Sequence, residues 1–276
     1  MILDTISFPT LTETDQQLPI FCTSVGHWDN QESIDRDSFP DFQWLQVTSG
    51  EGGLYIGEER FSVKAGQGFC LFPHVRHRYY AVHEPWEVYF LSFNGAMAEA
   101  LLGQAGIHRS GVYSTADGEM IVSHLRSLYT LTQSGRAFLG IECSKLVYLF
   151  LLDLIKVIMV SSQSAGQHYS KLQPVLRHIE ANIGSVITIK ELAAQIDVTP
   201  QYLCLLFKNA MGLRPMAFVN RERINRSKEL MFRENEHKMQ EIAALVGFES
   251  ASYFSYVFRK YEGVSPEQFK KIHGIR

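Results

Sequence analysis

The chain has 276 residues, of which 46% are hydrophobic and 20% charged, a composition typical of globular domains with packed cores and not of disordered or fibrous chains. Its four cysteines lie far apart without a Cys-x-x-Cys pair, so they indicate neither a zinc ribbon nor a disulfide framework. The first residues lack the basic start and apolar core of a secretory signal, and the most apolar run, 146–160, is too short to span a bilayer. These features argue against secreted disulfide-rich and membrane-spanning classes, and we expect a cytoplasmic protein that does not associate with membranes.

The charge is divided unevenly along the chain, whose net charge is −3. Residues 171–276 carry 16 Lys and Arg against 11 Asp and Glu, a net +5, whereas residues 1–170 carry 10 against 18, a net −8. A basic half in an otherwise acidic chain favours a nucleic-acid-binding face in that half, although ordinary surface charge gives the same number.

Short alternating or apolar runs fill the segment 41–95, separated by glycine and proline. In chain order the runs are FQWLQVT, GLYIG, RFSVK, GFCLF and EVYFLSF. Gly50, Gly52 and Gly53 separate the first two runs, where a tight turn favours a residue that adopts positive φ. The spacing predicts an all-β domain with hairpin-sized turns, either a small barrel or a sandwich.

The period-2 pattern is lost further on, and residues 118–162 predict two helices, the second over 138–159. Apolar side chains recur along this second helix at helical spacing, at Leu146, Phe150, Leu154 and Val157. The stripe is either part of the core or the seam of a homodimer. The polar segment 163–170 predicts a linker between a first domain, 1–162, and a second domain, 171–276.

The second domain repeats itself. Residues 188–198 align with 238–248 at an offset of 50, and after one inserted residue 202–212 align with 253–263. The repeat predicts two copies of one supersecondary unit.

Each copy has the pattern of a helix, a short turn and a second helix. In the first copy Thr188 and Glu191 form a capping box, and Thr199 precedes a Pro at the first position of the second helix. In the second copy Gly247 marks the turn. Helices of such helix-turn-helix units insert into the DNA major groove, and a connecting helix over 217–232 would let two units reach successive grooves.

Residues 171–276 resemble the DNA-binding domain of the AraC/XylS family over their full length. The resemblance rests on I-x-E-L-A…T-P-Q-Y-L-x-x-L-F-K…G at 189–212, N-R-x-R-I-x-x-S-K-E-L at 220–230, and E-I-A-x-x-V-G-F…S-Y-F-S-x-V-F-R-K…G-V-S-P-E-Q-F at 241–269. It implies a two-domain α+β protein, with a cupin-like β-barrel and trailing helices followed by an all-α domain of two helix-turn-helix units joined by a linker helix. It also implies a double-stranded operator and RNA polymerase as partners, dimerisation through the helix 138–159, and activation of transcription.

The same resemblance implies that exposed positions of each second helix face the bases. These positions are Gln201, Cys204, Leu205, Ala251, Ser252, Ser255 and Tyr256. Family members commonly carry Arg where Leu205 and Tyr256 stand, so readout here is expected to depend on Gln201, on thymine methyl groups and on DNA shape.

Two further sets of side chains belong to this domain. The basic set is expected either to contact phosphates or to form a solvated face, and comprises Lys208, Arg221, Arg223, Arg226, Arg259 and Lys260. The apolar set is expected to be core, and comprises Tyr202, Leu203, Leu206, Phe207, Tyr253, Phe254, Val257 and Phe258.

The segment 49–95 resembles the cupin-like sensor domain of the same family, through S-G-E-G-G-L-Y-I-G, V-K-A-G-Q-G-F-C-L-F-P, H-R-Y-Y and P-W-E-V-Y-F-L-S-F. A metal-dependent cupin needs a cluster of His and carboxylate ligands from two strands, but His74 and His77 have no His partner in the later strand 86–93. We therefore expect neither a metal nor another cofactor.

Aromatic side chains with polar tips favour a pocket for a small molecule, most simply a sugar or sugar derivative, because aromatic faces stack on sugar rings while Arg and Tyr bind their hydroxyls. The candidate ligand residues are Arg36, Trp44, His77, Tyr79, Trp86 and Phe90. Trp86 and Phe90 share one face of a strand and have a core interpretation as well.

We therefore expect a non-enzymatic, effector-responsive transcription activator. Three alternatives remain open. In the first alternative, the barrel is a catalytic cupin fused to a DNA-binding domain. In the second, the barrel serves assembly without an effector. The third alternative is a regulator with a methyl-accepting cysteine, although none of the four cysteines lies in an activating cluster.

Overall fold

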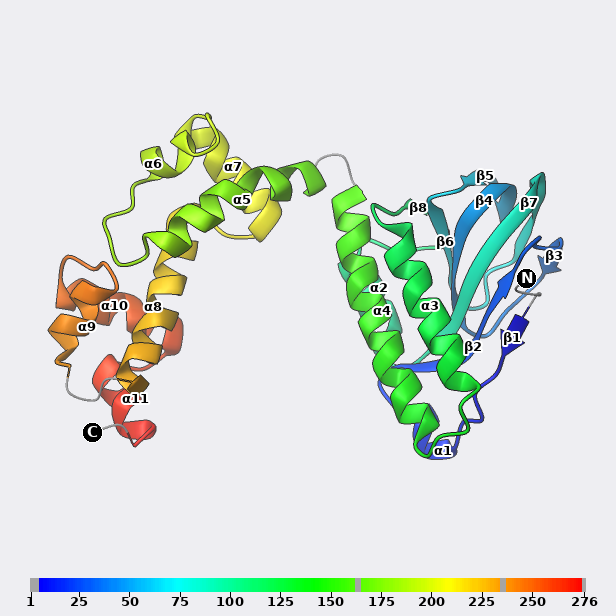
Figure 1. Ribbon diagram of the computed structural model, residues 1–276, viewed down its shortest axis with the longest axis horizontal. Helices are drawn as coiled ribbons and strands as arrows, with labels where there is room; N and C mark the ends of the chain where they lie inside the picture. Colours follow the sequence, from blue (N-terminus) through cyan, green and yellow to red (C-terminus); the bar gives the residue numbers. More distant parts are fainter. Residues whose placement is uncertain (1–4, 162–164, 234–236, 275–276) are drawn as a thin grey trace. The chain divides into compact units, whose positions relative to one another are not determined.

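The computed structural model describes residues 5–161, 165–233 and 237–274 (Figure 1). The chain forms two compact units, Met1–Gln163 and Ser164–Arg276. The first combines a sheet with helices, and the regular elements described in the second are all helices. The predicted two-domain α+β class is confirmed.

The strands of the first unit belong to one antiparallel sheet. They are β1 (Thr5–Ser7), β2 (Phe21–Trp28), β3 (Ile34–Arg36), β4 (Phe42–Ile56), β5 (Glu59–Lys64), β6 (Gln67–Leu71), β7 (His77–Asn94) and β8 (Gly111–Ser114). Their order is β1-β2-β7-β4-β6-β8, with β3 paired to β7 and β5 paired to β4.

The strand β4 differs from its prediction. The first two runs, expected as separate strands with a tight turn at Gly50, form one strand of 15 residues. Gly50 does adopt a positive φ of 76°, and the pairing with β7 shifts register between Val47 and Gly52. The glycines therefore produce bulges that bend a continuous strand, which curls the sheet on itself where a hairpin was expected.

Alternating side chains give the sheet two buried faces. Trp44 and Leu91 belong to the cluster that packs under the helices, which we call the helix-covered face. Leu45 and Phe90, one residue along each strand, belong to a second cluster on the inner face of the curled sheet. This period-2 division decides which predicted ligand residues share a cavity.

The helices of the first unit are α1 (Glu13–Gln16), α2 (Ala98–Gln104), α3 (Gly118–Thr132) and α4 (Leu139–Ser161). The predicted stripe on α4 is core, because Phe150, Leu154 and Val157 are at most 2% exposed and Leu146 packs against the same cluster. Another face of α4 carries large apolar side chains that are 40–45% exposed, at Ile141, Tyr148, Leu149, Leu152 and Met159.

The second unit contains α5 (Ala165–Ala181), α6 (Ile189–Ala194), α7 (Pro200–Met211), α8 (Pro215–Arg233), α9 (Met239–Leu245), α10 (Ala251–Glu262) and α11 (Pro266–Ile272). The linker predicted over 163–170 differs from the structure, since α5 already begins at Ala165. Polar composition suggested a linker, but polar side chains such as Gln are also good helix formers, so composition does not separate the two states.

The repeat seen in the sequence is a repeat of backbone conformation. The turn of the first helix-turn-helix places Asp197 at φ 52°, and the turn of the second helix-turn-helix places Gly247, fifty residues later, at φ 84°. Each helix-turn-helix unit has its own hydrophobic cluster, and α8 contributes Val219 to the first and Met231 to the second. The connecting helix predicted over 217–232 is thus confirmed as α8, and it is anchored in both cores.

Candidate DNA interface and ligand cavities

The second helix of each unit begins at a side-chain cap. The hydroxyl of Thr199 accepts a hydrogen bond from the backbone N–H of Tyr202 at 3.2 Å, and that of Ser250 accepts one from Tyr253 at 3.1 Å. These bonds satisfy backbone donors at the N-termini of α7 and α10. Each helix therefore starts at a defined residue, which fixes the side chains that follow on its exposed face.

The predicted base-reading positions lie on the surface of α7 and α10. On α7, Gln201 is exposed, Leu205 is 56% exposed and Cys204 is half-buried. On α10, Ser252 is exposed and Tyr256 is 64% exposed, with the half-buried Ala251 and Ser255 beside them. The four exposed side chains, those of Gln201, Leu205, Ser252 and Tyr256, are free of a core role, as contact with a ligand as large as DNA requires, whereas Ala251 also packs against the hydrophobic cluster of its unit.

Two tyrosines expected in the core are instead on this surface. Tyr202 is 41% exposed and Tyr253 is 52% exposed, so the core prediction for both is wrong. The physical reason is position, because Leu203 and Phe254, one residue later on each helix, already occupy the buried face. The tyrosines belong with the candidate DNA interface.

Arg223 corrects the predicted basic set. Its side chain is buried, its Nε donates to the carbonyl of Ile183 at 3.1 Å, and its NH2 nitrogen donates to the carbonyl of Ser185 at 2.6 Å. Its guanidinium lies over the ring of Phe248, and burial lowers its pKa. Arg223 shares the inward face of α8 with Val219, so it braces the loop before α6 and is not accessible to a phosphate.

The other basic residues predicted for DNA are exposed. These are Lys208 on α7, Arg221 and Arg226 on α8, and Arg259 and Lys260 on α10. Arg226 pairs with Glu229 at 2.7 Å in the same turn of α8, which reduces the charge that it offers. Lys208, Arg221, Arg259 and Lys260 therefore stay candidates for phosphate contacts.

Three predicted ligand residues meet at one cavity on the inner side of the sheet. Arg36, Tyr79 and Phe90 line a space of about 120 Å³. The guanidinium of Arg36 lies 4.8 Å from the ring centroid of Phe39, which holds it at the wall. Sequence reasoning missed other polar and aromatic side chains of the lining. They are Ser24 and Trp28 on β2, Gln31 in the loop after β2, and Gln43 on β4.

Both predicted tryptophans are structural. Trp44 and Trp86 have no exposed surface. Trp44 lies against Gly68 on the helix-covered face, and Trp86 lies against Gly52 on the inner face, where a Cβ atom on either glycine would come within 2.1 Å of an indole carbon. Neither ring lines the cavity, because each packs flat on a glycine of a neighbouring strand.

His77 lies beside that cavity without lining it. Its ring stacks on Tyr79 with centroids 6.1 Å apart, and its Nδ1 donates to the carbonyl of Val75 at 2.9 Å. Its Nε2 has no hydrogen-bond partner among the described residues, and burial lowers its pKa. His77 instead lines a separate surface hollow of about 400 Å³ together with Arg76 and Arg78.

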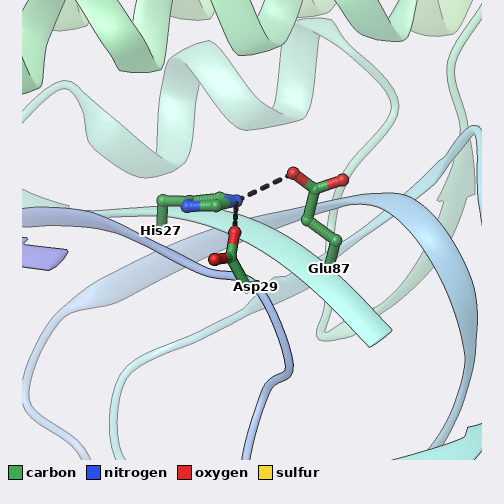
Figure 2. Close-up of side chains that lie close together, drawn as sticks. All are labelled: His27, Asp29 and Glu87. Atoms are coloured by element: carbon green, nitrogen blue, oxygen red, sulfur yellow. Dashed lines mark hydrogen bonds and ion pairs between the residues drawn. The ribbon is translucent and has the colours of Figure 1, made fainter. Parts of the chain in front are cut away.

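One group among the described residues has the spacing of metal ligands. It joins His27 of β2, Asp29 after β2 and Glu87 of β7, with one ligand atom from each within 4.8 Å of the others (Figure 2). Sequence reasoning missed it because it considered only His74 and His77. The Nε2 of His27 lies 2.9 Å from Glu87, whose other oxygen accepts from Thr48 at 2.7 Å, so hydrogen bonds account for this carboxylate and we assign no metal to it.

Comparison with protein families matches both halves of the chain. Residues 20–151 match the AraC-like ligand binding domain, and residues 192–272 match a helix-turn-helix domain. The chain belongs to the AraC family. It is a DNA-binding transcription regulator with a ligand-binding domain.

Relatives of this AraC-family regulator include proteins named for the operons that they regulate. It is 24% identical over 232 residues to the Msm operon regulatory protein of Streptococcus mutans, covering 82% of each chain. It is 23% identical over 233 residues to the lactose operon transcription activator of Staphylococcus xylosus, covering 83% of each chain. Among solved structures, the C-terminal domain of the response regulator yesN from Fusobacterium nucleatum is 30% identical, covering 35% of this chain and 93% of that one, with a TM-score of 0.34.

The helices within residues 5–161, 165–233 and 237–274 were expected not to span a membrane. None of these helices combines the length and the apolar character needed to cross a membrane.

Proposed function

We propose that this AraC-family regulator activates transcription of a carbohydrate operon by placing α7 and α10 in successive major grooves of its operator. The observation that carries the proposal is the matched exposed face of the two helices, at Gln201 and Leu205 on α7 and at Ser252 and Tyr256 on α10. Because α8 is anchored in the hydrophobic clusters of both helix-turn-helix motifs, it holds these two motifs in a defined relation. Phosphate contacts from Lys208, Arg221 and Arg259 would supply the part of the affinity that does not depend on sequence.

A sugar or sugar derivative is the proposed effector, bound in the cavity lined by Arg36, Tyr79 and Phe90. Arg36, Gln31 and Gln43 offer polar groups for hydroxyls, while Phe90 offers an aromatic face. The name of one relative, the lactose operon transcription activator, supports this ligand class. At about 120 Å³ the cavity is smaller than the roughly 300 Å³ of typical ligand pockets, so binding requires the lining side chains to move.

Such a movement gives the effector a way to act. A ligand shifts a conformational equilibrium only by its difference in affinity for two states. A cavity that must expand discriminates between an unliganded state and a liganded one. We propose that the liganded state changes which DNA half-sites the protein reaches and its contact with RNA polymerase.

Dimerisation through α4 is the remaining part of the proposal. Ile141, Tyr148, Leu152 and Met159 recur at intervals of seven and four residues and are 40–44% exposed. A continuous apolar stripe of this kind on a soluble domain favours a protein interface. A second copy of the chain is the proposed occupant, through the corresponding face of its own α4.

Selection of bound sequences from random duplex DNA at fixed salt tests the function, first without ligand and then with a panel of mono- and oligosaccharides. The expected result is a site of two elements about one helical turn apart, whose enrichment depends on a member of the panel. Binding that is only salt-sensitive and independent of sequence would overturn tandem readout. A specific site with no response to any sugar would retain the DNA function and overturn the effector class.

A further inference from the structure

A second cavity lies on the opposite face of the sheet from the proposed sugar site. It is enclosed between the strands β1, β2 and β7 and the helix α3, with a volume of about 340 Å³. This volume falls within the range of typical small-molecule pockets, which the inner cavity does not reach. The lining residues are Thr5, Gly26, His27, Tyr89, Leu125, Arg126, Tyr129 and Thr130, and none of them belongs to the predicted site.

The walls of this α3 cavity are largely apolar and held in place. The ring of Tyr89 stacks against His27 with centroids 4.1 Å apart. Its hydroxyl accepts a hydrogen bond from Arg126 at 3.1 Å, and the guanidinium lies 5.1 Å from the ring centroid. Leu125 and Tyr129 complete the wall on α3. An aromatic or alicyclic body therefore fits this space better than a polyhydroxylated sugar.

His27 gives the cavity one unused polar atom. The side chain is only 4% exposed, and its Nε2 faces the carboxylates of Glu87, at 2.9 Å, and Asp29, at 3.6 Å (Figure 2). Burial raises the pKa of Glu87, but hydrogen bonds from Thr48 and His27 outweigh burial and hold that pKa below its ordinary value. An ionised Glu87 only accepts hydrogen bonds, so Nε2 of His27 carries a hydrogen.

The other ring nitrogen is left without a partner. Nδ1 of His27 is buried and makes no hydrogen bond with any described residue. In the neutral ring Nδ1 is then an acceptor, and a buried acceptor without a donor is unfavourable. His27 lines the cavity, so a hydroxyl group bound there supplies the missing donor once the atoms that cover Nδ1 move aside.

We propose that the α3 cavity is a second effector site, for a neutral small molecule with an apolar ring and a hydroxyl group that donates to Nδ1 of His27. A neutral ligand fits better than an anion, because Arg126 already bonds to Glu119 at 2.9 Å and to Tyr89. Such a ligand would contact α3, which packs against α4 in the same cluster. The site goes beyond the proposed function, since a sugar in the inner cavity does not require it.

Phenol is a suitable probe, because it combines an aromatic ring with one hydroxyl. The full chain is labelled with ¹⁵N-histidine and titrated with phenol, and the His27 resonances are assigned by their loss in His27→Gln. We expect Nδ1 of His27 to shift saturably. Thr130→Phe, which fills the cavity from its exposed edge, is expected to weaken phenol binding by about tenfold or more, whereas the matched Ser123→Phe on the same helix, outside the cavity, is expected to leave it unchanged.

Two results would overturn the proposal. One is the absence of a saturable shift at His27 Nδ1 in the unmodified protein, and the other is an equal shift in Thr130→Phe. The nine remaining histidines report whether each variant is folded. A response at His77 with none at His27 is a case of the first result, and places phenol near the surface hollow that His77 lines. The sugar-response experiment is independent of all these outcomes.

Discussion

The ring of Tyr253 stacks on the ring of Tyr256 on the exposed face of α10, with centroids 6.4 Å apart and planes inclined by 22°. The first helix-turn-helix has Tyr202 and Leu205 at the equivalent places of α7, 51 residues earlier. The amino group of Lys171 lies over the ring of Tyr202, 5.2 Å from the ring centroid. Both α7 and α10 thus expose a tyrosine beside a second large side chain, Leu205 or Tyr256, and neither of these positions carries an Arg that could read guanine. Apolar contact with thymine methyl groups and with the sugar backbone is the readout that this surface supports.

Removal of one ring from this pair is expected to reduce specific binding. Tyr256→Ala should weaken binding to the selected operator by about tenfold and leave binding to scrambled DNA unchanged, because base contacts carry sequence preference while phosphate contacts do not. Fluorescence anisotropy at fixed salt measures both affinities. Arg259→Ala on the same helix is the control, and should weaken both affinities equally and reduce the salt slope by about 1. Equal losses for Tyr256→Ala on the two DNAs would contradict base readout by this ring.

Substitution of Arg223 is expected to lower the stability of the second unit, whereas substitution of Arg221 is expected to weaken DNA binding. Arg223→Met leaves the carbonyls of Ile183 and Ser185 without their donors, and should destabilise the second unit by about 2–4 kcal/mol. Arg221→Met changes an exposed side chain, and should alter stability by less than about 0.5 kcal/mol while weakening DNA binding.

The three tryptophans, all in the first unit, make this comparison possible in the full chain. Urea unfolding followed by far-UV circular dichroism reports both units, while tryptophan fluorescence reports the first alone. Arg223→Met should shift only the dichroism transition. A shift of the fluorescence transition as well, or loss of DNA binding without loss of stability, would contradict a purely bracing role.

The contrast between the two arginines also shows what the sequence could predict. The helix-turn-helix repeat was predictable because its signals are local, such as the cap at Thr199 and the turn at Gly247. The burial of Arg223 was not, since its partners lie about 40 residues away in a loop before α6. The full burial of Trp44 and Trp86 away from the cavity was not predictable either, because the cavity depends on how bent strands pair and not on residue type.

A charge on the exposed stripe of α4 is expected to separate the protomers. Leu152 is 40% exposed, so Leu152→Glu should leave the fold of the first unit intact and convert a dimer into a monomer, because a carboxylate buried in an apolar interface has no partner. Light scattering after size-exclusion chromatography gives the mass. Ser127→Glu, on the exposed side of α3, is the control and should remain dimeric. A dimer that persists in Leu152→Glu would place the interface elsewhere.

His77 is expected to make the first unit sensitive to mild acid. Burial lowers its pKa below the ordinary 6.5, the charge of Arg36 lowers it further, and its bond to Val75 and the charge of Asp35 only partly oppose these effects. As the pH falls through 6.5, the unfolded chain therefore takes up a proton before the folded chain does. The stabilising contribution is complete above pH 6.5 and is lost as the pH falls toward the folded pKa. Thermal melting followed by tryptophan fluorescence should give a lower midpoint at pH 5.5 than at pH 7.5, a difference that His77→Gln reduces and that His108→Gln, an exposed control, leaves unchanged. An identical difference in His77→Gln would assign the acid sensitivity to other groups.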